Sequence, residues 1–396
     1  MAGLIDTTLR EGAQTPGVQF TLPQKIAIGR AVAALGIDEI EAGTATVLDT
    51  DLAPLLAALR EMDSPPRLSL WCRCRSADII HAGRLRPDIL SLSMPASERH
   101  IRARLGKSRT WVLASLEKAV GMARESGIFR LSLGVEDASR AEKGFLGELI
   151  GAAVGLGVER IRLADTVGIL TPGMTAALVS EQRRLHPGVE FGFHGHNDFG
   201  MASANAVSAL EAGARWADVT VLGLGERAGC SRLEEVSALL TLVHGKKKYR
   251  LERLAALCTM VSEASGREIA VNHPLVGRGI FTCESGLHVH GLLADPASYE
   301  PFPPERVNGS RTIQLGSKSG SRAVAGCLAR LGMQVSADTL PETVRLIRRL
   351  ATRLGRPLLD AEVKNLVEHA NICPRGENWF CGYALRATRW CNRASR

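Results

Sequence analysis

The feature of this sequence that most constrains its fold is a repeated alternation of short apolar runs and longer amphipathic stretches, from Leu4 to about Gly245. Short apolar runs predict buried strands, and amphipathic stretches predict helices. Eight such pairs in about 250 residues are what a closed parallel (β/α)8 barrel requires. The predicted strands are Leu4–Leu9, Glu39–Ala42, Arg67–Cys72, Asp88–Met94, Arg130–Val135, Arg160–Asp165, Glu190–His196 and Ala217–Leu222. The predicted helices are Pro23–Leu35, Thr50–Met62, Ala77–Leu85, Trp111–Ser126, Lys143–Gly155, Pro172–Leu185, Met201–Ala212, Leu233–Val243, Ala323–Leu331 and Pro341–Leu354.

The end of this alternation near Gly245 indicates a second region. A stretch rich in Pro and Gly, Asn272–Gly320, follows and precedes the last helical patterns. We therefore expect an α/β chain with a (β/α)8 barrel over residues 1–250, a linker or lid over 251–320 and a smaller, mainly helical region over 321–396.

The composition agrees with a large packed protein. Of the 396 residues, 45% are hydrophobic and 23% are charged, so disorder is not expected. The net charge of +8 could favour nucleic acid, but aromatic residues, at 4%, are too few to interleave with the basic clusters Lys246–Arg250 and Arg386–Arg396. Small anionic substrates explain the basic excess equally well, and we expect no nucleic-acid partner.

Neither a membrane nor an oxidising compartment is indicated. No apolar stretch is long enough to span a bilayer, and no apolar signal core follows Met1, so we expect a cytoplasmic protein without membrane contact. The nine cysteines are an odd number, and the pair Cys72-x-Cys74 lacks metal-finger spacing. Reduced thiols are therefore expected.

Reactive residues follow the predicted strands at their carboxyl ends, where barrels of this kind carry their active sites. The first strand leads into Asp6–Gly12, which contains Arg10 and Glu11. The seventh ends in His194-Gly195-His196, where the two-residue period of a strand points both imidazoles to one side. Two imidazoles and one carboxylate make a metal-ligand set that leaves positions open for substrate.

Each of these residues also has a plain structural explanation. A His-x-His on a strand is often a satisfied polar pair, and Asp137 or Asp165 could simply cap the helix that follows. Polar residues nevertheless follow several strands at the same predicted rim, including Glu136 and the run Gly223–Gly229. Taken together they favour an active site.

These motifs resemble the DRE-TIM metallolyase family, which includes isopropylmalate, citramalate and homocitrate synthases and 3-hydroxy-3-methylglutaryl-CoA lyase. The similarity covers about four-fifths of the chain and is greatest to homocitrate synthases associated with nitrogenase. The matching segments are Asp6–Gly12, Gly134–Ala141, Ala164–Gly168, His194–Asp198, Gly223–Gly229, Phe281–His288, His288–Leu293 and Leu315–Gly320.

The resemblance implies a divalent metal ion held by Glu11, His194 and His196, with Mn²⁺ or Mg²⁺ expected first and Zn²⁺ as a further option. It implies acetyl-CoA and a 2-oxo acid as substrates, with Arg10 stabilising the negative charge that develops on oxygen. The reaction expected is condensation with 2-oxoglutarate and thioester hydrolysis, which give (R)-homocitrate and CoA.

The resemblance also implies roles for residues around the metal. The expected substrate-binding residues are Gln14, Arg140 and Thr166. The expected catalytic residues besides Arg10 are Glu136, as the base, with His288 and Tyr299. His288 and Tyr299 are expected to come from the partner subunit, so a homodimer in which lid residues cross the interface is implied.

The chain departs from the family pattern at several motif positions. Cys230 replaces an Asn near the metal, and it is either a soft ligand that favours Zn²⁺ or Fe²⁺ or a small buried thiol without contacts. The other departures are Ala13, Cys283, His290, Ser317 and Lys318. Isopropylmalate or citramalate synthesis, cleavage of a CoA ester and binding of an oxo acid without catalysis remain open alternatives.

Overall fold

The computed structural model describes residues 2–372. The chain divides into two compact units, of which the first ends at Gly277 and the second begins at Arg278. Each unit is described by itself.

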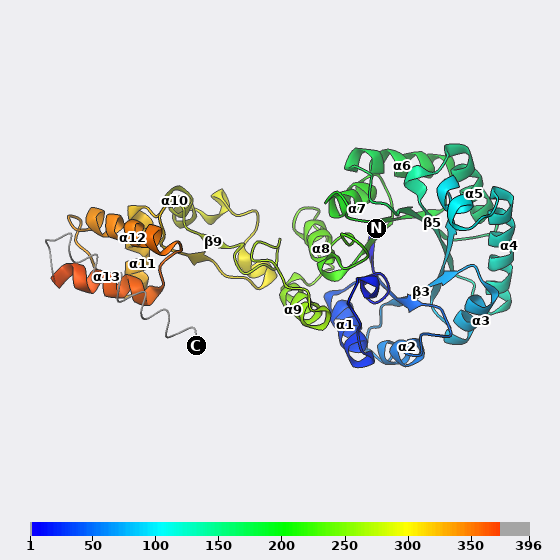
Figure 1. Cartoon of the computed structure of the whole chain (residues 1–396), viewed down its shortest axis with the longest axis horizontal. Coiled ribbons are helices and arrows are strands. Elements are labelled where there is room, and N and C mark those ends of the chain that lie inside the picture. Colours follow the sequence, from blue (N-terminus) through cyan, green and yellow to red (C-terminus); the bar gives the residue numbers. More distant parts are fainter. Residues whose placement is uncertain (1, 373–396) are drawn as a thin grey trace. The chain divides into compact units, whose positions relative to one another are not determined.

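The first unit is a closed barrel of eight parallel strands, as the sequence predicts. Neighbouring strands pair in chain order, and β1 closes the barrel by pairing with β8, with Gly3 opposite Trp216. The strands appear end on in Figure 1. Their bounds are β1 Gly3–Asp6, β2 Glu39–Thr44, β3 Arg67–Arg73, β4 Ile89–Pro95, β5 Leu131–Glu136, β6 Arg160–Asp165, β7 Glu190–Gly195 and β8 Trp216–Val219.

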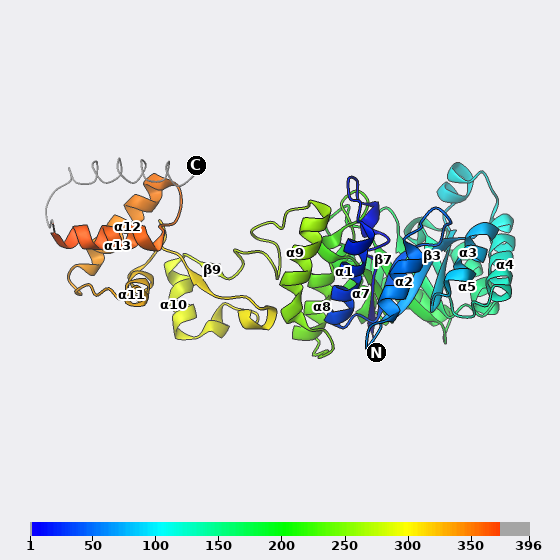
Figure 2. The ribbon, with the colours of Figure 1, turned by 90° about the horizontal axis from the view of Figure 1, so that it is seen from below.

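Helices pack around the outside of this barrel, and Figure 2 shows them alongside the strands. Their bounds are α1 Leu22–Leu35, α2 Leu52–Arg60, α3 Ser76–Leu85, α4 Arg109–Glu125, α5 Lys143–Gly155, α6 Pro172–Leu185, α7 Ala202–Glu211, α8 Leu233–Leu242 and α9 Leu254–Ser265. Helices α5 and α6 agree with the prediction to the residue. Helix α9 was not predicted, because it lies beyond the eighth βα pair, where the alternation ends.

The first strand is shorter than predicted, because a side-chain turn ends it. The carboxylate of Asp6 accepts hydrogen bonds from the backbone N–H of Thr8 at 3.1 Å and from its hydroxyl at 2.9 Å. The chain therefore turns after Asp6, and Arg10 and Glu11 lie in the turn rather than on the strand. The eighth strand likewise ends early, at Val219, before the left-handed residue Leu222 (φ 58°).

Charged side chains fill part of the barrel interior, where branched apolar residues are usual. Arg160 on β6 donates two hydrogen bonds of 2.9 Å to the two carboxylate oxygens of Glu39 on β2. Two residues further along each strand, Arg162 donates to Glu41 at 2.8 Å and lies 3.0 Å from Asp218 on β8. All five side chains are buried. Each charge has an opposite partner, which a buried ion needs.

The second unit is mainly helical, as expected for its C-terminal part. Helices α11 (Ser321–Arg330) and α12 (Leu340–Leu354) confirm the two predicted helices, and their apolar faces form a core around Val324 and Ile347. The remaining elements are α10 Gly286–Ala294, α13 Asp360–Ile372 and the paired short strands β9 Thr282–Cys283 and β10 Thr312–Ile313. Helix α10 lies inside the stretch expected to be loops, because the Gly, Pro and His residues of that stretch weaken its helical pattern.

Among residues 2–372, no helix combines the length and the apolar character needed to cross a bilayer.

Candidate metal centre and active site

Four buried side chains meet at the carboxyl-terminal rim of the barrel. Glu11 comes from the turn after β1, His194 from β7, His196 from the residue after β7, and Cys230 from the loop after β8. One donor atom of each lies within 4.8 Å of the others. The structure thus brings together the three ligands expected from the resemblance and adds a thiol.

Local geometry explains why the two imidazoles are adjacent. His194 and His196 are two residues apart in extended backbone, so their rings lie on the same side with centroids 5.1 Å apart. The Nε2 atom of His196 lies 4.0 Å from Oε1 of Glu11. Three donors of the expected set therefore face one small volume.

The carboxylate of Glu11 fits a cation in this volume. Burial opposes its ionisation, but the charge of Arg10, the two imidazoles and a backbone N–H together outweigh that effect and lower the pKa of Glu11. Arg10 donates to Oε2, while Oε1 is buried and accepts no hydrogen bond from any described residue. A buried carboxylate oxygen without a partner is costly, and a divalent metal ion would supply one. The residues therefore fit a metal bound by imidazole and carboxylate groups.

Asp218 orients one of the imidazoles. Its Oδ2 lies 2.9 Å from Nδ1 of His194 and also contacts Arg162. This contact engages Nδ1 and leaves Nε2 of His194 for a metal ion. Metal-ligating histidines commonly have their other ring nitrogen held by a carboxylate in this way.

The guanidinium of Arg10 is fixed next to the ligands. Its Nε donates to Glu41 at 2.6 Å, its Nη1 donates to Glu11, and its Cζ lies 6.0 Å from the centroid of the Trp71 ring. Burial lowers the pKa of Arg10, but the charges of Glu41 and Glu11 more than compensate and raise it. Arg10 is therefore a permanent, immobile cation beside the proposed metal position.

Glu136, at the end of β5, is bound in a polar cluster. Its carboxylate accepts a hydrogen bond from Ser93 at 2.7 Å and forms an ion pair with Arg104. The Nδ1 atom of His100 lies 3.8 Å from the same carboxylate. Burial alone would raise the pKa of this carboxylate, but these contacts lower it to about 2. The group is ionised, as a base must be, and is a weak acceptor of protons while the contacts persist.

Arg140 and Thr166 are linked through Asp137. The carboxylate of Asp137 accepts hydrogen bonds from Nε and Nη2 of Arg140, both at 2.8 Å. The backbone N–H of Asp137 donates to the Thr166 hydroxyl at 2.9 Å. The Thr166 hydroxyl donates no hydrogen bond to any described residue, so its proton is available to an anion.

The neighbouring carboxylate, Asp165, holds the loop after β6 and does not cap the helix that follows, because the N-cap of α6 is Thr171. Asp165 accepts hydrogen bonds from the backbone N–H groups of Ile169 at 3.2 Å and Leu170 at 2.8 Å. Arg227 joins the loops after β6 and β7, because it donates to Asp198 at 2.9 Å and to the carbonyl of Thr166 at 2.8 Å.

The remaining predicted residues are exposed, and two of the three belong to the second unit. Gln14 is exposed on a short 3₁₀ turn, Gly12–Gln14. His288 and Tyr299 belong to the second unit, where their rings contact each other with centroids 4.5 Å apart. Both are exposed within that unit.

Sequence analysis missed the residues that support the ligands, namely Glu41, Arg162 and Asp218. A signal was present. Strands buried in a parallel barrel are normally continuous apolar runs, so charged residues at alternate positions of such strands indicate polar contacts inside the barrel. Glu39-x-Glu41 and Arg160-x-Arg162 are such patterns, with opposite charges on two different strands.

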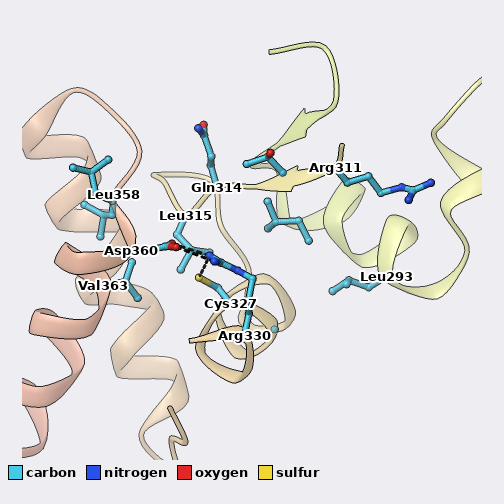
Figure 3. Close-up of a pocket in the computed structure, with 13 residues that line it drawn as sticks. Leu293, Arg311, Gln314, Leu315, Cys327, Arg330, Leu358, Asp360 and Val363 are labelled. Atoms are coloured by element: carbon cyan, nitrogen blue, oxygen red, sulfur yellow. Dashed lines mark hydrogen bonds and ion pairs between the residues drawn. The ribbon is translucent and has the colours of Figure 1, made fainter. Parts of the chain in front are cut away.

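A cavity of about 660 Å³ lies in the second unit, and the residues that line it all belong to that unit. Figure 3 shows Arg330 in it pointing toward Asp360 and Cys327, and the Arg330–Asp360 ion pair measures 2.7 Å. Arg311 at its edge is paired with Glu300 at 2.6 Å. Because these charges already have partners, the cavity does not offer a free cation to an anionic substrate.

The barrel and its buried ligand set define a class of metal-dependent (β/α)8 proteins. Comparison with family models identifies the family. The HMGL-like model matches residues 2–261, and a model described as homocitrate synthase post-HMGL domain-like matches residues 275–354. The chain belongs to the HMGL-like family, within the DRE-TIM synthases that the motifs resemble.

Relatives with three different names are similarly close. A homocitrate synthase of Frankia alni is 39% identical over 83% of this chain and 93% of its own length. A protein of Methanosphaerula palustris named as a citramalate synthase is 39% identical over 92% of this chain and 72% of its own. 2-Isopropylmalate synthase 2 of Caldanaerobacter subterraneus is 36% identical over 92% of this chain and 94% of its own.

A solved structure agrees with the fold. The HMG-CoA lyase of Brucella melitensis superposes with a TM-score of 0.60 at 21% identity and covers 67% of this chain and 99% of its own.

We predict that Asp218→Asn weakens metal binding about 10–100-fold, because the anchor that orients His194 is lost. Isothermal titration with Mn²⁺ would measure the change. The matched control is Asp78→Asn, which alters another buried aspartate paired with an arginine, Arg73, at 2.7 Å. Equal affinities in the Asp218 variant and the wild type would contradict the role of Asp218.

Proposed function

We propose that this protein is a metal-dependent acyltransferase that condenses acetyl-CoA with 2-oxoglutarate and releases CoA by thioester hydrolysis, giving (R)-homocitrate. The observation that carries the proposal is the buried set of Glu11, His194 and His196 with the fixed cation of Arg10 beside it. Membership of a family whose relatives are synthases of this type supports it.

Glu11, His194 and His196 are the residues proposed to hold the divalent ion, and Mn²⁺ or Mg²⁺ is the choice implied by the resemblance. When bound, such an ion supplies Lewis acidity toward the carbonyl and carboxylate of a 2-oxo acid. The protein contributes a dry, fixed set of donors, since all three side chains are buried.

Arg10 is proposed to stabilise the negative oxygen that forms when acetyl-CoA loses a proton. Glu41 and Glu11 already hold the guanidinium, so it does not need to reorganise during the reaction. Trp71 covers part of the same group. Water is thereby limited around a charge that acts more strongly in a low-dielectric site.

Glu136 remains the proposed base for the acetyl methyl group. A base works best when its pKa lies near the working pH. The low pKa of Glu136 must therefore rise before this carboxylate can accept the proton efficiently. Release of Arg104 when substrate binds would raise the pKa of Glu136 toward the working pH. The exposed position of Arg104 makes such a movement inexpensive.

Substrate choice is proposed to depend on Thr166, Arg140 and Gln14. The free Thr166 proton suits the carboxylate that all 2-oxo acids share. Arg140 is the candidate for the second carboxylate of 2-oxoglutarate, with its Nη1 unbonded to any described residue. Asp137 already offsets part of its charge, which keeps the aliphatic acceptors 2-oxoisovalerate and pyruvate as the alternative supported by the relatives' names.

The assembly and location stay predictions. We propose a cytoplasmic homodimer in which His288 and Tyr299 of one subunit serve the barrel of the other. The contact between their two rings supports a shared role for this pair.

The test is CoA release from acetyl-CoA by the purified, metal-loaded chain with 2-oxoglutarate, 2-oxoisovalerate and pyruvate in parallel. We expect release with 2-oxoglutarate. A preference for either other acid would reassign the protein to isopropylmalate or citramalate synthesis. Cleavage of a 3-hydroxy-acyl-CoA without added oxo acid would instead identify a lyase, and binding of oxo acid without turnover a non-catalytic protein.

We predict that Arg10→Lys lowers turnover about 10²–10³-fold, as expected for a lost oxyanion-type donor. Lysine keeps the positive charge, but it lacks the planar guanidinium whose nitrogens donate to Glu41 and to Glu11 at the same time. Steady-state kinetics would measure kcat, with metal content as the control. A near-normal kcat would remove Arg10 from the mechanism.

We further predict that Arg104→Met moves the acidic limb of the kcat/KM–pH profile to higher pH. The ionised base is the active form, so activity rises with pH through the pKa of Glu136, and removing Arg104 raises that pKa from about 2. The matched control is Arg102→Met, two residues away, where Arg102 pairs with Glu98 at 2.6 Å instead. An unshifted limb would mean that Glu136 is not the base whose titration limits the rate.

A further inference from the structure

The thiol of Cys230 lies in the metal-ligand set rather than in the apolar core. Its Sγ is 3.8 Å from Nδ1 of His196 and within 4.8 Å of the donor atoms of Glu11 and His194. Only 3% of the residue is exposed. An ordinary buried cysteine packs against apolar side chains, whereas this one faces two imidazoles and a carboxylate.

The backbone holds the thiol in this position. His196 and Cys230 lie opposite each other in an isolated antiparallel bridge, and the Cys230 N–H donates to the carbonyl of Gly223 at 3.0 Å. A Cβ on Gly225 would come within 2.9 Å of Sγ, and one on Gly229 within 1.9 Å of the Gly223 carbonyl oxygen. Glycine at these two positions lets the loop close tightly and leaves space for the sulfur.

A second observation points to a ligand at the same place. Oε1 of Glu11 is buried, accepts no hydrogen bond from any described residue and faces the volume that the thiol also faces. The four donor atoms lie within 4.8 Å of one another. This separation is only slightly larger than the distance that one ion can bridge with bonds of about 2.0–2.3 Å. The cluster therefore needs a cation, and sulfur is one of the donors in reach.

We propose that Cys230 is a fourth protein ligand, which binds the metal ion as a thiolate. The inference rests on the metal centre of the proposed function and extends it. On binding, the S–H bond of Cys230 breaks, an Sγ–metal bond forms, and the proton leaves to solvent. The ligand set becomes two nitrogens, one oxygen and one sulfur.

This ligand set favours softer ions than the Mn²⁺ or Mg²⁺ that the family resemblance implies first. Thiolate is a soft donor that favours Zn²⁺, Fe²⁺ or Co²⁺, whereas Mg²⁺ and Mn²⁺ prefer oxygen. Four protein ligands complete a tetrahedral Zn²⁺ site, while a six-coordinate ion such as Fe²⁺ keeps positions for substrate. The chain is therefore adapted to a softer ion than Mn²⁺ or Mg²⁺.

The test is a Co²⁺ titration of the chelator-stripped full chain, followed by near-ultraviolet absorption. A thiolate bound to Co²⁺ gives an intense charge-transfer band that nitrogen and oxygen ligands do not give. We expect this band in the wild type, its loss in Cys230→Ser and its retention in Cys258→Ser, a control at a thiol that is equally buried in α9. We also expect Cys230→Ser to lower Zn²⁺ affinity about 10–100-fold and to leave Mn²⁺ affinity unchanged.

Each outcome decides the assignment. Stoichiometric Co²⁺ binding without the band, or a band that survives in Cys230→Ser, overturns thiolate ligation. Absence of any metal binding overturns both this inference and the metal centre. A Cys230-dependent band in a protein that releases no CoA with any oxo acid supports the ligand and refutes the proposed function, so the two failures are distinguishable.

Discussion

The rest of the site depends on the ion pairs enclosed in the barrel. Arg162 lies between Glu41 and Asp218, and each of these carboxylates has a second partner, Arg10 and His194 respectively. The cation and the first imidazole of the proposed active site are thus positioned by one buried arginine. Buried charges must stay paired, because removing one partner of a buried pair typically costs about 3–5 kcal/mol.

The remaining ligands reach this network from loops, and the loops are held by one another. Thr8, in the turn after β1, accepts a hydrogen bond from the Val221 N–H at 2.9 Å, and the Thr15 hydroxyl accepts one from the Gly225 N–H at 2.8 Å. The turn that carries Glu11 and the loop that carries Cys230 are therefore joined by short polar contacts. A site built from irregular backbone needs such support to keep donor atoms within a few tenths of an ångström.

The fold could be predicted from the sequence, because the spacing of apolar residues distinguishes strands from helices. The eight strands and the helices between them follow from apolar spacing, and errors concentrate where a side chain overrides that spacing, as Asp6 does when it ends β1. The positions of Glu11, His194 and His196 followed from strand ends and alternation. The support of Asp218 did not, because its partners Arg162 and His194 come from two other strands and only the register of the closed barrel brings them together. The contacts that lower the pKa of Glu136 could not be predicted for the same reason, since Arg104 comes from a π-helical segment after β4, Arg99–Arg104.

The architecture separates what all 2-oxo acids share from what distinguishes them. Under the proposed function, the ligands and Arg10 meet the carboxylate and carbonyl common to every acceptor, and Arg10 and His194 are held by the barrel's internal charges. The Asp137–Arg140 pair instead lies in the loop after β5, with Asp137 buried and Arg140 partly exposed, outside the ion pairs enclosed in the barrel. Relatives with different names at 36–39% identity fit this division. Cys230 belongs with the residues that meet every acceptor. A change at Cys230 alters the ion and hence the chemistry available to any acceptor. Under the two proposals, acceptor choice and metal choice depend on different residues and can be measured independently.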